Sequence, residues 1–103
     1  MANPHRGEVA ARIGGRDMTL CLTLGALAEL EARLGGGDLV GLGARFAEGR
    51  ISARDLTAIL GAGLRGAGNA MSDDELARLP IEGGVRGAAE IAVKLLTYAF
   101  GES

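Results

Sequence analysis

One stretch of the chain, residues 18–37 (MTLCLTLGALAELEARLGGG), constrains the fold most, because its hydrophobic period changes halfway along. In its first half apolar residues alternate with Thr and Cys, which is the period of a strand; they are Met18, Leu20 and Leu22. In its second half leucines recur every three or four residues, as on one helix face; they are Leu24, Leu27, Leu30 and Leu34. The sequence therefore predicts a strand that passes directly into a helix, with one apolar face running along both.

A second run with the strand period, EVAARI, lies just before this stretch, so a hairpin is expected. Gly14 and Gly15 between the two runs can adopt the positive φ angles of a tight turn. A loop of two residues and a loop of four both keep the apolar faces together. They pair Val9 with Leu20 or Ile13 with Met18, respectively. An antiparallel hairpin is predicted over residues 8–23, with its register open.

Capping signals and apolar spacing predict helices after the hairpin. Thr23 is a candidate N-cap for a helix over about residues 24–34, which three glycines then end. Asp38 can cap a second short helix, LVGLGARFAEG. Ser52 begins a third, whose apolar stripe consists of Leu56, Ile59, Leu60 and Leu64. These signals place three helices before residue 67.

Two further helices are predicted towards the end of the chain. Ser72 and Glu75 have the spacing of a capping box for DDELARL, which Pro80 ends. The last helix is expected over about residues 85–100. Its inward side is predicted to hold Val85, Ala88, Ala92, Leu95, Leu96 and Ala99. Its outward side carries Arg86, Glu90 and Lys94, and Glu90 is expected to pair with both neighbours.

The predicted fold class is α+β, with an N-terminal two-stranded antiparallel β-hairpin followed by a compact bundle of four to five short helices. A chain of 103 residues is expected to form a single domain, 1–103. It would comprise a flexible N-terminal arm at 1–7, the hairpin at 8–23 and a helical part at 24–100. Glycine-rich joints at 35–37, 61–68 and 83–87 are the expected mobile points.

Composition argues against several classes of function. The net charge is −2, from 11 basic and 13 acidic residues, whereas nucleic-acid-binding surfaces usually carry a basic excess. The single cysteine, Cys21, excludes an intramolecular disulfide. No apolar run approaches the roughly 18 residues of a membrane span. We therefore expect a cytoplasmic protein that binds neither nucleic acid nor membrane.

The residue types that carry catalysis are sparse, so no enzyme, cofactor, metal or small-molecule substrate is expected. His5 is the only histidine, which leaves no Cys/His cluster for zinc and no base for a serine nucleophile. The carboxylates at residues 73–75 fall in the first turn of a helix, where the helix dipole favours them. GAGLRG, residues 61–66, matches G-x-G-x-x-G but follows a predicted helix instead of a strand. Glu29 and Arg33 are expected to pair on the surface.

Four segments carry a resemblance to a known family. They are NPHRGEV (3–9), LTLGALAELEARLG (22–35), SARDLTAILGAGLRG (52–66) and GAAEIAVKLLTYAFG (87–101). Together they resemble a small family encoded in the tail gene clusters of gene transfer agents, which are phage-like particles that package bacterial DNA, and of related prophages. The resemblance implies a role in tail morphogenesis, either as a tail assembly chaperone or as a structural component such as a tail tube or connector subunit.

The predicted fold favours the chaperone. A tail tube is a ring of subunits whose sheets form a continuous β-wall, and two strands are too few for such a wall. A chaperone coats the long helical tape-measure protein, for which amphipathic helices are suited. The expected partners are the tape-measure protein or other tail proteins, with homo-oligomerisation or incorporation in the particle as alternatives. The predicted partner-binding residues are Leu39, Leu42, Phe46, Leu96 and Phe100.

Overall fold

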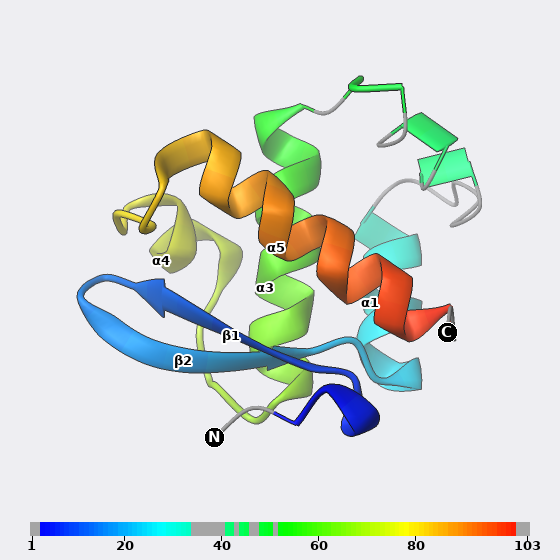
Figure 1. Cartoon of the computed structure of the whole chain (residues 1–103), viewed down its shortest axis with the longest axis horizontal. Coiled ribbons are helices and arrows are strands. Elements are labelled where there is room, and N and C mark those ends of the chain that lie inside the picture. Colours follow the sequence, from blue (N-terminus) through cyan, green and yellow to red (C-terminus); the bar gives the residue numbers. More distant parts are fainter. Residues whose placement is uncertain (1–2, 34–40, 43, 46–47, 51, 101–103) are drawn as a thin grey trace.

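The computed structural model describes residues 3–33, 41–42, 44–45, 48–50 and 52–100. Within these residues an antiparallel hairpin is followed by four helices, which confirms the predicted α+β class (Figure 1). The strands are β1 (Glu8–Ile13) and β2 (Arg16–Cys21). The helices are α1 (Leu24–Arg33), α3 (Ala53–Gly66), α4 (Asp73–Ala77) and α5 (Gly84–Ala99). A short 3-10 turn, η1 (Pro4–Arg6), precedes β1.

The hairpin has the two-residue loop, which was one of the two predicted alternatives. Val9 pairs with Leu20 and Ile13 with Arg16. Gly14 and Gly15 have φ angles of 61° and 78°, as a primed turn requires. β2 begins and ends two residues before the predicted strand, because Thr23 caps α1 with its side-chain oxygen 3.1 Å from the backbone nitrogen of Ala26.

Other segments contact the outer edge of β1 near both of its ends. Just before η1, the Asn3 carbonyl accepts a hydrogen bond from the backbone nitrogen of Glu8 at 3.1 Å. This contact ties residues of the predicted flexible arm to the start of β1. At the other end, the Arg12 carbonyl accepts from the nitrogen of Glu82 at 3.1 Å, and a bridge joins Ile13 to Ile81. A further strand could therefore not pair along the full length of this edge without breaking these contacts.

Helix α3 lies at the centre of the fold and packs against β2, α1, α4 and α5 (Figure 1). Ser52 caps it as predicted, accepting from the Asp55 nitrogen at 3.0 Å. All four residues of its predicted stripe are buried, and so is the run from Ala58 to Leu64. The apolar stripe predicted the helix, but it did not show that the helix is buried on all sides from Ala58 to Leu64.

Residues 61–66 belong to α3, so the predicted mobile joint at 61–68 is wrong for this part. The glycines let neighbouring elements approach closely. A Cβ on Gly66 would overlap the carbonyl oxygen of Cys21 in β2. A Cβ on Gly63 would lie 3.0 Å from Leu95 Cδ1 and 3.2 Å from the Cβ of Leu20. Tight packing thus explains glycines that intrinsic helix propensity disfavours.

Two residues of the predicted apolar faces lie outside the core. Leu24 is 86% exposed, because the buried face of α1 is centred on Ala26 and Leu30, and Leu24 points largely away from that face. Val85 is 75% exposed at the first turn of α5, where it lies at the margin of the buried face. The remaining predicted inward residues of α5 are buried or half-buried: Ala88, Ala92, Leu95, Leu96 and Ala99.

Two other predicted helices have different outcomes. The capping box of α4 is confirmed, since the Ser72 side chain accepts from the Glu75 nitrogen and the Glu75 side chain accepts from the Ser72 nitrogen. Five of the eleven residues of the helix predicted from Leu39 to Gly49 lie outside the described residues: 39–40, 43 and 46–47. Within it, residues 41–42 and 44–45 are helical.

Candidate protein-interaction site

Apolar side chains are exposed along one side of α5. The exposed fractions are 75% for Val85, 47% for Val93 and 46% for Phe100. Phe100 is the C-cap residue of α5. With half-buried Ala89 the three exposed residues follow the repeat of one helix face, and we refer to these four residues as the α5 face. In the described part of the chain, the only other large hydrophobic residue that is exposed is Leu24. The α5 face is therefore the main concentration of exposed apolar side chains in that part.

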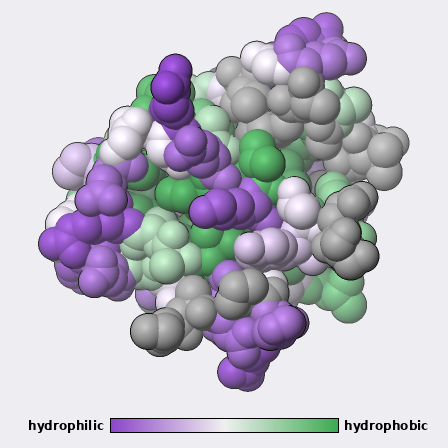
Figure 2. Space-filling view, viewed as in Figure 1, coloured by the Kyte–Doolittle hydropathy of each residue, from purple (hydrophilic) through white to green (hydrophobic). Residues whose placement is uncertain are grey.

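Three charged residues border the α5 face. Arg86, Glu90 and Lys94 are exposed at four-residue spacing and, with Ala89 and Val93, line a shallow depression. The predicted ion pairs of Glu90 with Arg86 and Lys94 are wrong, because among the described residues neither pair is within ion-pair distance. Figure 2 shows hydrophobic and hydrophilic side chains side by side on the side of the molecule that carries α5.

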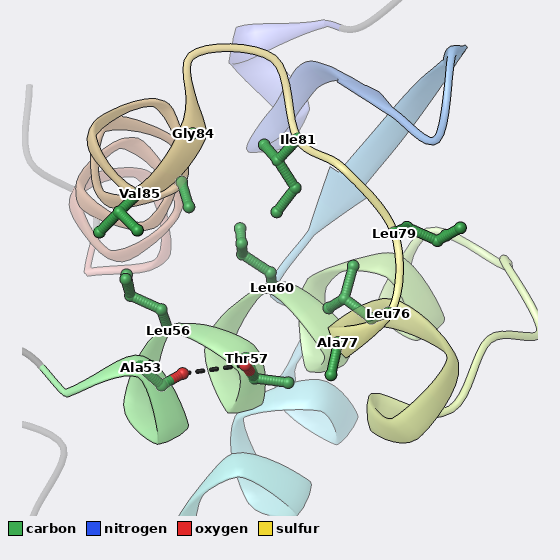
Figure 3. A pocket seen from close by; sticks show the side chains of 11 residues that line it. Ala53, Leu56, Thr57, Leu60, Leu76, Ala77, Leu79, Ile81, Gly84 and Val85 are labelled. Carbon is green, nitrogen blue, oxygen red and sulfur yellow. Dashed lines mark hydrogen bonds between the residues drawn. The ribbon is translucent and has the colours of Figure 1, made fainter.

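An apolar cavity adjoins the start of this face (Figure 3). Its volume is about 180 Å³, and it lies between α3, α4, the first turn of α5 and the segment from Leu79 to Gly84. Its lining includes Leu56, Leu60, Leu76, Ile81 and Val85. The hydroxyl of Thr57, also in the lining, donates to the Ala53 carbonyl at 2.9 Å. A cavity of roughly 150 Å³ with aliphatic walls can hold a benzene molecule, so this one has room for a large apolar side chain.

A network of four charged side chains joins α1, α3 and α4. Arg65 Nε donates to Glu29 Oε1 at 2.7 Å, Arg65 Nη1 lies 3.0 Å from Asp73 Oδ1, and Arg33 Nη1 donates to Asp73 Oδ2 at 2.7 Å. The predicted Glu29–Arg33 pair is therefore wrong, since each residue pairs with another helix. Burial acts to lower the pKa of Arg65, but hydrogen bonds to Glu29 and Asp73 outweigh it, so the pKa is raised. Two positive and two negative charges compensate one another here, which makes this a structural cluster.

The remaining candidates for chemistry have structural roles. Cys21 is half-buried with Sγ 3.5 Å from the Arg6 carbonyl oxygen, and burial together with Glu8 raises its pKa, which disfavours the reactive thiolate. Hydrogen bonds from Ser72 lower the pKa of Glu75 within the capping box. The G-x-G-x-x-G match lies inside α3, where no strand leads into it. Among the described residues, no three His, Cys, Asp or Glu side chains are placed to hold a metal ion.

The predicted partner-binding residues are not gathered on one surface. Leu42 and Leu96 lie in the core, 1% and 5% exposed, whereas Phe100 is half-exposed on the α5 face. Leu39 and Phe46 lie outside the described residues. Sequence reasoning missed Val85 and Val93, although their four-residue spacing around Ala89, beside three charged residues, was a usable signal. Whether any of these residues contacts a partner stays a prediction.

Comparison with known families agrees with the resemblance drawn from the sequence. Residues 6–102 match the family described as phage tail tube protein, GTA-gp10. Because the match covers nearly the whole chain, the chain belongs to this family of tail proteins from gene transfer agents and phages. No curated protein and no solved structure matches the chain. None of the described helices combines the length and the apolar character needed to cross a membrane.

Proposed function

We propose that this chain is a non-enzymatic tail assembly chaperone that binds the tape-measure protein before the tube is built. The observation that carries the proposal is that other segments of the chain already contact the outer edges of the hairpin. Its two strands are the only ones in the described part of the chain, and each outer edge already makes contacts with other segments along part of its length. The family description, phage tail tube protein, favours the alternative of a structural tail component.

A tube wall would require strands that continue from one subunit to the next. On β1, the outward-facing nitrogen of Glu8 donates to the Asn3 carbonyl, and the outward-facing carbonyl of Arg12 accepts from the Glu82 nitrogen. On β2, the Thr19 carbonyl accepts from Asn69 Nδ2 at 2.9 Å, and Gly66 packs against Cys21. Adding a strand at either edge would break these contacts, which argues against the hairpin as part of a continuous β-wall.

The apolar features instead suit a helical partner. The α5 face offers a row of exposed apolar side chains, and the adjoining cavity can accept one further apolar side chain. Sites that bind an amphipathic helix in a groove usually combine these two features. A tape-measure protein is long and helical, and its apolar stripes need cover until tube subunits assemble around it. We place this binding in the bacterial cytoplasm during assembly. Incorporation in the finished particle belongs to the structural alternative.

Co-expression with the tape-measure protein of the same tail gene cluster tests the proposal. We expect a soluble complex on size-exclusion chromatography with light scattering, and an insoluble tape-measure protein when it is expressed alone. Finished particles should then lack this chain. Rings or polymers of this chain alone, together with no complex, would instead identify a structural tail component.

A further inference from the structure

We propose that the α5 face and the adjoining cavity bind one amphipathic helix of a different chain, and that this helix carries carboxylates opposite Arg86 and Lys94. This inference rests on the proposed function, in which the helix is a segment of the tape-measure protein. It adds the surface that binds the segment and the pattern of side chains that the segment must present.

The face and the cavity form one continuous surface because Val85 belongs to both. Val85 lines the cavity together with Leu56 and Leu60 from α3 (Figure 3). It also begins the exposed stripe that continues through Ala89 and Val93. A helix lying along α5 would cover the valines and could insert one large aliphatic side chain into the cavity at its end. Such an anchored contact is typical of the residues that dominate binding free energy.

The charges on α5 oppose pairing with a second copy that is centred on Glu90 or aligned in parallel register. Arg86, Glu90 and Lys94 form a pattern of positive, negative and positive charge that is symmetric about Glu90. In an antiparallel pair centred on this residue, Arg86 would face Lys94 and Glu90 would face its own copy. In a parallel pair in register, each residue would face its own copy. Both arrangements place like charges opposite one another, which disfavours a symmetric dimer in these two registers.

The same pattern defines the complementary partner. Opposite a positive, a negative and a positive side chain, the best match is a carboxylate, a base and a second carboxylate at four-residue spacing. Since the pattern reads the same in both directions, it accepts either orientation of the partner helix. Two cations against one anion also give the border of the face a net positive charge. A partner helix with a net acidic flank is therefore preferred.

The test compares variants of the full chain co-expressed with the tape-measure protein from the same tail cluster. Val93→Glu places a carboxylate on the α5 face, and Leu24→Glu makes the same change at an exposed leucine of α1. The double variant Arg86→Glu/Lys94→Glu reverses the border charges without altering any buried residue. Circular dichroism melts establish that each variant is folded, and biolayer interferometry on the purified complexes measures how fast each variant dissociates from the tape-measure protein.

We expect Val93→Glu to weaken binding by roughly tenfold or more, and the double charge reversal to weaken it roughly threefold. Leu24→Glu should bind like the wild type, and higher salt should weaken wild-type binding but not that of the reversed variant. If both α5 variants bind as tightly as the wild type, the α5 face is not the binding surface, although the chaperone proposal still stands. A wild-type chain that does not bind would overturn both. A wild-type dimer that Val93→Glu dissociates would identify a second copy as the occupant and overturn the inference.

Discussion

Helices α3 and α5 cross each other and are both rich in Ala, Leu and Gly, yet they are used in different ways (Figure 1). Helix α3 is in contact with the hairpin and with three helices, and its residues from Ala58 to Leu64 are all buried. Helix α5 buries one side only, and its other side carries exposed valines and three charges. The first is enclosed by the fold over much of its length, whereas the second leaves one face exposed, and this is the face where we propose that a partner binds.

The two helices also differ at their beginnings. α3 starts at a serine cap whose side chain accepts a backbone hydrogen bond. α5 starts after Gly83, which has a φ of 85° and makes no side-chain cap. Capping typically contributes about 1 kcal/mol, so α5 depends more on its packing against α3 for stability. Substitutions in the two helices should therefore separate effects on folding from effects on binding.

The largest expected effect comes from truncating a buried side chain of α3. Leu64→Ala should lower the free energy of unfolding by about 3 kcal/mol, because Leu64 is 0% exposed and the site would be left as a cavity. The matched change Val93→Ala in α5 should lower it by less than about 0.5 kcal/mol. Urea unfolding followed by circular dichroism measures both. Equal losses would mean that Val93 contributes to the core as much as Leu64 does, and that the α5 face is not a free surface.

The next effect concerns the glycines that allow close packing. Gly66→Ala should lower the free energy of unfolding by about 2 kcal/mol, because the added Cβ would overlap the Cys21 carbonyl oxygen and push α3 away from β2. Gly25→Ala is the control, since its added Cβ meets only Thr23 Oγ1, at 3.9 Å. In α1 this change should raise stability by about 0.5 kcal/mol. Thermal melts of the two variants should shift in opposite directions, and a neutral Gly66→Ala would contradict the close contact.

The smallest effect tests α4, the short helix between α3 and α5. The pKa of Glu75 is below its ordinary value of 4.5 in the folded chain, because of its hydrogen bonds with Ser72. A lowered pKa adds stability above pH 4.5, and this contribution is lost as the pH falls through the folded-state value. Glu75→Gln keeps a capping side chain but does not titrate. Between about pH 6 and about pH 3, the melting temperature of the wild type should therefore fall further than that of Glu75→Gln. Equal decreases in the two proteins would count against the capping box.

Local signals in the sequence were sufficient for the hairpin turn and for three helix starts. The paired glycines predicted the hairpin turn, Thr23, Ser52 and Ser72 predicted three helix starts, and all three caps form. Caps and turns depend on residues within about four positions of one another, so the sequence alone carries them. The hairpin register was narrowed to two alternatives, because both placed the apolar faces on the same side.

The candidate site was not predictable in the same way. Val85 was assigned to the core and Val93 was not singled out, while Leu42 and Leu96 were assigned to a partner but lie in the core. Periodicity identifies which residues share a helix face. It does not say how that face is rotated towards its neighbours or how far along the helix they extend. A difference of one turn is enough to exchange a core residue for a surface one.

By itself the sequence determined an α+β chain with a hairpin, its capped helices and its family. Tertiary structure decided three further properties. It placed GAGLRG inside a buried helix, where the closeness of Cys21 and Leu95 compensates for the low helix propensity of glycine. It also redirected Glu29 and Arg33 from each other to Arg65 and Asp73. Finally, it exposed one side of α5, because the packing of α5 against α3 and the hairpin covers only the other.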